Sequence, residues 1–166
     1  MKKIILKPAE ENDAKFIYNL TKEKKFSKYY LGRLIAKSLK EQKDKIQKFN
    51  KLAEKDLRYY FVIMRGKEKV GIIDLYKISL QDKRFSLGYG VSEKYHKKGI
   101  AKKAVKQALK FAKKKGLYGC EAIVDPKNIA SKKVLEKNGF KKIGLIKDYY
   151  FEENKYWDIE LYWKTL

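Results

Sequence analysis

The 166-residue sequence predicts a mixed α/β fold, and a strand–helix–strand unit in its middle carries that prediction. Apolar residues recur at three- and four-residue steps over residues 101–112, as on the buried side of an amphipathic helix. Apolar runs typical of strands, over residues 84–91 and 119–124, flank this helix. Since the helix joins them as a crossover, the two strands are expected to be parallel.

The segments before this unit predict a strand, two helices and a hairpin. A short strand over residues 4–6 ends at Pro8, and a helix follows over residues 10–21. Large apolar residues keep an approximate helical period over residues 28–55, which favours one long helical region. Strands over 59–64 and 70–78 then form a hairpin around the Gly66 turn.

After the central unit, Asn128 can cap a helix over residues 129–137, and Asn138-Gly139 ends it. The last elements are a strand over 140–146, a loop over 148–155 and a strand over 156–163. The predicted order is β-α-α-β-β-β-α-β-α-β-β, an α/β (α+β) fold with a mixed sheet of about seven strands and about four helices. This length suits a single domain over residues 1–166.

The net charge of +22 is extreme, with 42 basic and 20 acidic residues. Nearly all of the cations are lysine, whereas specific nucleic-acid readers favour arginine. Lysine spread along the whole chain is typical of compositional bias or of a thermophile surface. The charge should still attract polyanions, including ribosomes, without sequence specificity at low salt.

One cysteine and one histidine restrict the chemistry of the chain. Cys120 cannot form an internal disulfide, and its apolar strand context predicts a buried, inert thiol. With His96 as the one histidine, no metal site is expected. The N-terminal apolar run is too short for a signal peptide, and no run approaches about 18 apolar residues. We therefore expect a cytoplasmic protein, a monomer or homodimer with no membrane segment.

The start of the central helix has the properties of an anion site. The first N–H groups of a helix lack intrahelical partners and carry partial positive charge. Gly99 lets a ligand approach the backbone without meeting a Cβ atom, and Ala101 leaves the first turn uncrowded. Two explanations stay open for Lys97, Lys98 and Lys102, which are a bound anion or a solvated charged face.

Residues 96–101, with the sequence HKKGIA, resemble the (Gln/Arg)-x-x-Gly-x-(Gly/Ala) signature of GNAT-superfamily N-acetyltransferases. His96 departs from it, because Gln or Arg is usual there. The resemblance implies that the loop amides cradle the pyrophosphate of acetyl-CoA, the co-substrate. The residues so implied are His96, Lys97, Lys98, Gly99, Ile100, Ala101 and Lys102.

A second motif, made of two runs of residues, points to one branch of this family. The runs VDPKNIAS at residues 124–131 and LEKNGF at 135–140 resemble a pattern of the ribosomal-protein N-acetyltransferases. The two motifs, their separation and the element order make the resemblance cover essentially the whole chain. It implies the GNAT fold and transfer of an acetyl group from acetyl-CoA to a primary amine.

The resemblance also assigns roles around the two central strands. Backbone of Tyr89, Gly90 and Val91 would pair with the pantetheine arm, and the Val91 amide would polarise the acetyl carbonyl. Asn128 would cap its helix and also contact the pantetheine amides. Many family members protonate the thiolate with a tyrosine at the position that Leu135 occupies here. Ser131 is therefore the candidate acid, with an ordinary first-turn helix residue as the alternative.

Two carboxylates are candidate bases. Asp74 lies in the middle of a predicted strand, where it could be a base, act through a water, bind the amine or face solvent. Glu93 follows the next strand and could instead be an exposed loop residue. A weak base suffices for an α-amine, whose pKa is about 7.7–8.0 against about 10.4 for lysine.

A protein N-terminal amine is accordingly the first acceptor expected, with a polyamine, amino sugar or antibiotic as the alternative. A basic RNA- or ribosome-binding protein without catalysis is the alternative of another class. Aromatic and acidic residues fall in the regions that border the acceptor cleft of the family. They are Tyr29, Tyr30, Tyr149, Tyr150, Glu152, Glu153, Tyr156, Trp157 and Asp158. The aromatic residues could instead be packing, and the acidic ones could attract a cationic amine or belong to a solvated loop.

Overall fold

The computed structural model describes residues 2–29 and 35–166. Its strands are β1 (Ile4–Pro8), β2 (Tyr59–Arg65), β3 (Glu68–Ser79), β4 (Arg84–Val91), β5 (Gly119–Val124), β6 (Lys141–Glu152) and β7 (Lys155–Thr165). Its helices are α1 (Ala14–Thr21), α2 (Lys24–Ser27), α3 (Leu39–Ala53), α4 (Ile100–Lys114) and α5 (Ile129–Glu136). Short 3-10 turns, η1 (Glu11–Asp13) and η3 (Glu93–Tyr95), precede α1 and α4. Over the described residues, no helix is long and apolar enough to cross a membrane.

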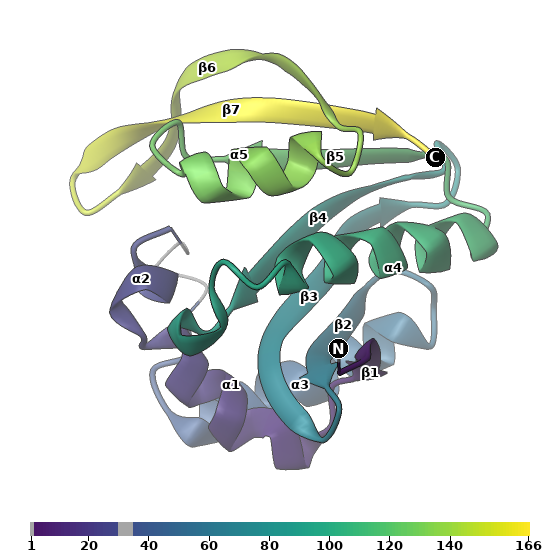
Figure 1. Ribbon diagram of the computed structural model, residues 1–166, viewed down its shortest axis with the longest axis vertical. Helices are drawn as coiled ribbons and strands as arrows, with labels where there is room; N and C mark the ends of the chain where they lie inside the picture. Colours follow the sequence, from purple (N-terminus) through teal and green to yellow (C-terminus); the bar gives the residue numbers. More distant parts are fainter. Residues whose placement is uncertain (1, 30–34) are drawn as a thin grey trace.

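The strands form one mixed sheet in the order β1-β2-β3-β4-β5-β7-β6 (Figure 1). Neighbouring strands are antiparallel except for β4 and β5, which run parallel. This confirms the predicted mixed fold and the crossover through α4. The bounds of β4 and β5 agree with the sequence prediction to the residue.

Helices cover both faces of the sheet, which explains why the start of β2 is buried throughout. Tyr59, Phe61 and Ile63 belong to one core with the alanine-rich side of α4. The alternate residues, Tyr60 and Val62, pack with α1 and α3 on the opposite face. Figure 1 shows α4 and α5 on one side of the sheet, with α1 and α3 on the other.

The prediction of one helical region over residues 28–55 is wrong, because α3 begins only at Leu39. The Ser38 side chain accepts a hydrogen bond from the Glu41 amide at 3.1 Å, and the Glu41 carboxylate accepts one from the Lys37 amide at 2.7 Å. This arrangement caps a helix at Ser38 and stops it from extending backwards. The predicted helical positions at residues 30–34, and with them Tyr30, lie outside the described residues.

The predicted loop over residues 148–155 is also wrong, because β6 continues to Glu152 and β7 begins at Lys155. Glu153 and Asn154 form the connecting turn, with φ angles of 53° and 57°. Two consecutive positive φ angles are typical of a tight hairpin turn. The register shifts between Ile146 and Tyr150, and this bulge carries the acidic and aromatic run within a strand.

A glycine sets the close approach of β3 to the end of β4. A Cβ atom on Gly71 would lie 2.3 Å from the Gly90 carbonyl oxygen and 3.0 Å from the Val91 Cα atom. Both contacts are with backbone, which cannot rotate away. The backbone of β4 at Gly90 and Val91 can therefore lie this close to β3 only because residue 71 has no side chain.

We expect Gly71→Ala to lower the free energy of unfolding by about 1–3 kcal/mol, because the added methyl group forces β3 and β4 apart. Urea denaturation measures the change. Gly144→Ala in β6 is the matched control, since a Cβ atom there meets nothing within 4 Å, and its effect should stay within about 0.5 kcal/mol. Equal effects in the two variants would contradict the close approach.

Candidate active site

Strands β4 and β5 separate after a short paired stretch. They pair only through Arg84 with Gly119, Phe85 with Cys120, and Ser86 with Glu121. Beyond Ser86, residues 87–91 of β4 have no partner on β5 among the described strand pairs, while β5 stays paired with β7 along its length. Figure 1 shows the two strands meeting near the C-terminus and diverging toward α2.

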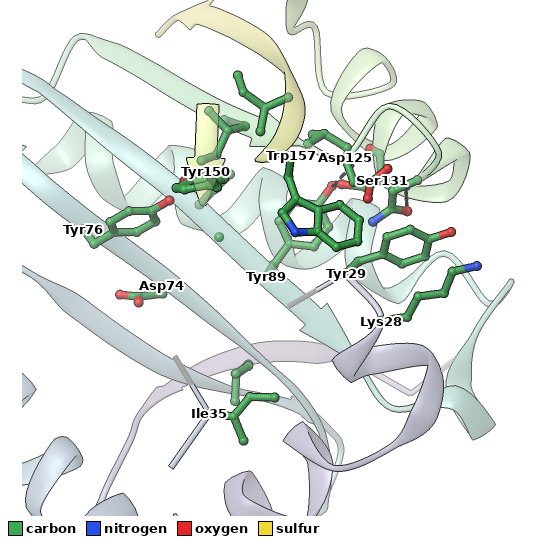
Figure 2. Close-up of a pocket in the computed structure, with 18 of the residues that line it drawn as sticks. Lys28, Tyr29, Ile35, Asp74, Tyr76, Tyr89, Asp125, Ser131, Tyr150 and Trp157 are labelled. Atoms are coloured by element: carbon green, nitrogen blue, oxygen red, sulfur yellow. Dashed lines mark hydrogen bonds between the residues drawn. The ribbon is translucent and has the colours of Figure 1, made fainter. Parts of the chain in front are cut away.

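A cavity of about 860 Å³ lies at this gap (Figure 2). Its walls come from β3, β4, β5, α5 and the end of the β6–β7 hairpin. Aromatic rings form much of the lining: Tyr29, Phe49, Tyr76, Tyr89, Tyr150 and Trp157. A cavity of this volume has room for a flexible ligand, and its aromatic lining would exclude much of the water around that ligand.

The cavity is locally acidic in a basic protein. Its carboxylates are Asp74, Asp125, Glu152, Glu153 and Asp158. Its cations are Lys28, Lys45, Arg58 and Lys77. The described lining residues thus include five carboxylates and four cations, whereas the whole chain has 42 basic and 20 acidic residues, so carboxylates are enriched at the cavity. The carboxylates at the end of the β6–β7 hairpin offer local partners to a positively charged group.

A pair of hydroxyl groups bridges the gap between β4 and α5. The Tyr89 hydroxyl lies 2.9 Å from the Ser131 Oγ atom and donates a hydrogen bond to the Ser131 carbonyl oxygen at 3.2 Å. The Ser131 amide donates to the Asn128 Oδ1 atom at 3.1 Å, so Asn128 caps α5 as predicted. Burial raises the pKa of Tyr89, which keeps the phenol protonated near neutral pH.

Asp74 is held in the cavity wall by an arginine. The Arg58 Nε atom donates to Oδ1 at 3.0 Å, and a second guanidinium nitrogen donates to Oδ2. Asp74 is 8% exposed, so it does not simply face solvent. Burial raises the pKa of the Asp74 carboxyl, and the Arg58 charge opposes that rise.

Glu93 has a different environment from Asp74. Its carboxylate accepts a hydrogen bond from the Lys25 amide at 2.6 Å, and it is not among the residues that line the cavity. In return, the Glu23 carboxylate accepts from the Ser92 hydroxyl and the Glu93 amide, each at 2.8 Å. These contacts fix α2 against the segment that follows β4.

Gly90 is the second point at which α2 meets β4. The Phe26 ring packs on it so closely that a Cβ atom at Gly90 would lie 2.1 Å from the Phe26 Cε2 atom. Val91 ends the strand, and its carbonyl oxygen lies 2.9 Å from the His96 Nε2 atom. The histidine that departs from the family signature thus ties the loop back to β4.

The loop before α4 is open where the anion site is predicted. Gly99 has a φ angle of 70°, and a Cβ atom there would meet nothing within 4 Å. Lys97 also adopts a positive φ angle, 59°, and the Lys98 ammonium donates to the Lys94 carbonyl oxygen at 2.9 Å. The amides of Ile100, Ala101 and Lys102 begin α4, where N–H groups have no intrahelical acceptor.

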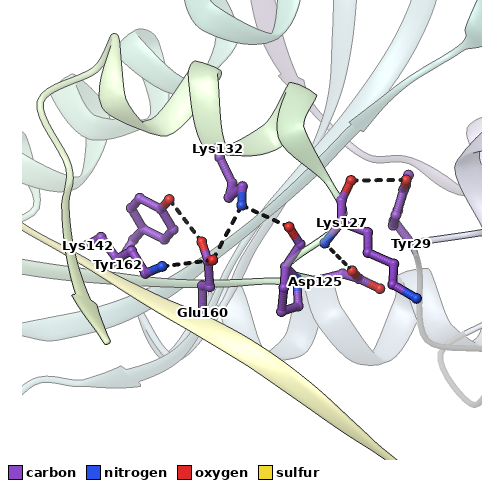
Figure 3. A network of polar contacts seen from close by, with 8 residues as sticks. Tyr29, Asp125, Lys127, Lys132, Lys142, Glu160 and Tyr162 are labelled. Carbon is purple, nitrogen blue, oxygen red and sulfur yellow. Dashed lines mark hydrogen bonds and ion pairs between the residues drawn. The ribbon is translucent and has the colours of Figure 1, made fainter. Parts of the chain in front are cut away.

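A buried glutamate fixes the turn before α5 (Figure 3). Glu160 of β7 accepts from the Lys142 ammonium at 2.8 Å, from the Lys132 ammonium at 3.3 Å and from the Tyr162 hydroxyl at 3.2 Å. The Lys132 ammonium also donates to the Pro126 carbonyl oxygen at 2.8 Å. The two lysines lower the pKa of the Glu160 carboxyl, so it remains ionised at neutral pH.

The sequence did not predict Arg58, the Glu160 cluster or the role of the Tyr89 hydroxyl. A signal for Arg58 was available, because a carboxylate in the middle of a strand needs a partner. Arg58 immediately precedes the neighbouring antiparallel strand β2, in which Tyr60 lies opposite Asp74. Ser131, the partner of the Tyr89 hydroxyl, and Lys132, one of the partners of Glu160, lie on α5, and no local pattern gives the position of α5 relative to the strands.

Some of the aromatic and acidic residues expected at the acceptor cleft line the cavity, and others do not. Tyr29, Tyr150 and Trp157 line the cavity together with the three carboxylates of the hairpin, whereas Tyr149 and Tyr156 are not among its lining residues.

Cys120 is fully buried, and burial raises the pKa of its thiol, which agrees with an inert side chain. Over residues 2–29 and 35–166, no three His, Cys, Asp or Glu side chains are grouped as metal ligands.

Comparisons with known proteins place the chain in a family. Residues 3–141 match the model of the acetyltransferase (GNAT) domain. The probable N-acetyltransferase YjcK of Bacillus subtilis (strain 168) is 30% identical over 87% of this chain and 83% of its own length.

Solved structures share the fold. The ribosomal α-N-protein acetyltransferase RimL in complex with coenzyme A has a TM-score of 0.91 and 18% identity, covering 100% of this chain and 96% of RimL. The spermidine N-acetyltransferase of Vibrio cholerae, in complex with CoA and spermine, has a TM-score of 0.85 and 20% identity. The match covers 98% of this chain and 95% of the Vibrio cholerae enzyme. The chain therefore belongs to the GNAT acetyltransferase family and is an N-acetyltransferase.

Proposed function

We propose that the protein transfers the acetyl group of acetyl-CoA to a protein N-terminal amine. The observation that carries this proposal is the gap between β4 and β5, which opens onto an acidic cavity. The gap suits an extended thioester carrier, and the carboxylates around it suit a cationic amine. The two substrates would meet where the strands diverge.

The described residues fit coenzyme A at two places. Residues 87–91 of β4 offer backbone groups without a β5 partner, and the amide-rich pantetheine arm can pair with Tyr89, Gly90 and Val91. The open backbone at Gly99 and the start of α4 suit the diphosphate, with Lys97, Lys98 and Lys102 adding positive charge. When bound, the thioester supplies the activated acetyl group.

The residues of the chain would then position the reacting groups. The Val91 amide would polarise the acetyl carbonyl as the bond from carbon to the amine nitrogen forms and the bond from carbon to sulfur breaks. The Ser131 hydroxyl would give its proton to the departing thiolate, and Tyr89 holds Ser131 in place. Asp74 would accept the proton of the amine, since it reaches the cavity and Glu93 does not line it.

An α-amine suits this site better than a polyamine. At neutral pH roughly a tenth of an α-amine is already unprotonated, so the weak base offered by Asp74 is sufficient. A polyamine carries several ammonium groups, which like a lysine side chain stay almost fully protonated at neutral pH and need a stronger base. A peptide N-terminus carries one such charge, and its amide backbone is neutral.

We expect Gly99→Glu to weaken CoA binding at least about 100-fold, or about 2.7 kcal/mol, because its carboxylate would occupy the diphosphate position. Isothermal titration calorimetry measures the affinity. Gly116→Glu is the matched control, since Gly116 also has a positive φ angle, 78°, and open space around it, but follows α4. It should bind CoA within about threefold of the unmodified protein. Undiminished affinity in Gly99→Glu would refute the cradle.

We expect Ser131→Ala to lower kcat by about 10²-fold or more while CoA affinity stays near normal, because only proton transfer is lost. Tyr89→Phe should lower kcat less, since Ser131 keeps its hydroxyl. The double variant should be no slower than Ser131→Ala, because Tyr89 acts through Ser131. Steady-state kinetics with a thiol-release assay measures this series. Additive losses would show that the two hydroxyls act separately.

The acceptor is tested by incubating the protein with acetyl-CoA and a mixture of peptides with free N-termini, spermidine, amino sugars and aminoglycosides. Mass spectrometry then identifies each product that gains an acetyl group. We expect peptide α-amines to be the preferred acceptors, with lysine side chains unmodified because their amines are almost fully protonated. Modification of spermidine alone, or of an amino sugar alone, would overturn the proposed acceptor and leave acetyl transfer standing.

A further inference from the structure

A groove between α4 and the start of β1 is lined mainly by lysine. It encloses about 360 Å³, and its lysines are Lys2, Lys3, Lys103, Lys106 and Lys110. Gln107 of α4 donates a side-chain hydrogen bond to the Ile4 carbonyl oxygen, which holds the start of β1 against the helix. The groove shares no lining residue with the active-site cavity.

Three of the groove lysines, Lys103, Lys106 and Lys110, lie on α4, and Lys2 and Lys3 come just before β1. Ala104, Val105 and Ala108 bury the inner side against the sheet. Lys106 and Lys110 are one helical turn apart, a rise of about 6 Å. Like charges at this spacing destabilise a helix, and the side chains of Lys3, Lys106 and Lys110 make no hydrogen bond or ion pair within the described part of the chain.

Lysine-rich composition does not explain this surface, as α3 shows. Helix α3 carries lysines at positions 40, 43, 45, 48 and 51, but Glu41 and Asp44 are interspersed with them. Lys43 also pairs with Glu11 at 3.1 Å. Helix α4 has the same length as α3 and carries no acidic residue, although both helices expose one side to solvent. A bias toward lysine would act on both helices alike.

The geometry favours an extended polyanion. Lys2 pairs with Glu68 at 3.6 Å, but the exposed Lys3, Lys106 and Lys110 can each meet one phosphate, and lysine binds phosphate as a point charge without reading bases. No aromatic side chain is among the described residues lining the groove, so it lacks the stacking surface that single-stranded nucleic acid requires. Ile4 is buried, so the groove also lacks the apolar anchor that an acidic protein partner would use.

We propose that the groove formed by Lys2, Lys3, Lys103, Lys106 and Lys110 docks the phosphate backbone of a nucleic-acid duplex. Binding there leaves the active-site cavity free, so the enzyme can hold a duplex and acetylate an amine at the same time. The inference does not depend on which amine is the acceptor.

The test compares two charge-reversal variants by fluorescence anisotropy with labelled RNA and DNA duplexes of about 20 base pairs. Lys3→Glu/Lys106→Glu/Lys110→Glu changes the groove. Lys40→Glu/Lys48→Glu/Lys51→Glu changes exposed lysines of α3 and alters the net charge by the same amount. Titrations run from about 50 to 200 mM salt, and stabilisation by CoA in a thermal shift assay checks that each variant is folded.

We expect the groove variant to lose about 100-fold or more in duplex affinity, with the slope of log affinity against log salt reduced by about 3. The α3 variant should lose less than about tenfold. Similar binding of RNA and DNA duplexes, or tighter binding of RNA, supports a backbone site.

Equal losses of duplex affinity in the two variants would overturn the proposed duplex site in the groove, because overall charge would then account for binding. Failure of the unmodified protein to bind either duplex would overturn it too, as would tighter binding of a polyglutamate peptide than of a duplex. None of these results bears on acetyl transfer, which the acceptor screen measures separately.

Discussion

The separation of β4 from β5 is the constraint on which the rest of the structure depends. A parallel pair inside a sheet normally satisfies the backbone groups of both strands, and here that pairing stops after Ser86 and Glu121. The strands can part because each keeps its other neighbour: β3 continues beside β4, and β7 continues beside β5. The exposed edges of the gap are thus held rigidly, with hydrogen-bonding groups available to a ligand.

Several contacts fix the elements on the two sides of this gap. Tyr89 reaches from β4 to Ser131 on α5, while Phe26 of α2 packs directly on Gly90. The Glu160 cluster joins β6, β7 and the turn before α5 through two lysines. The two lysines compensate the charge of Glu160 inside the protein, so the Glu160 carboxylate fixes the positions of these elements and is not available to a ligand.

Charge is distributed unevenly over this basic protein, and the distribution separates two kinds of surface. The active-site cavity gathers carboxylates from β3, from the turn after β5 and from the β6–β7 hairpin. The outer side of α4 gathers lysines without acids. A cationic amine and a polyanion would therefore be drawn to different parts of the molecule, although the net charge alone would attract only the second.

Local signals predicted much of this architecture. Strands β4 and β5 were predicted to the residue because turns and glycines bound their apolar runs, and the helix starts at Gly99 and Asn128 were predicted from local cap signals. The helix over residues 28–55 failed because apolar spacing was followed through the cap at Ser38. Partners such as Arg58 depend on strand register and on the packing of α5, which are fixed by contacts between distant segments.

The hydroxyl bridge between Tyr89 and Ser131 has a consequence for how binding energy is used. Because the bridge forms within the protein alone, the cost of fixing the two walls is met during folding. A carrier that binds there, as proposed, would lose little affinity to ordering its site. The entropic cost of binding would then fall mainly on the flexible carrier, because the wedge between the strands is already shaped before it arrives.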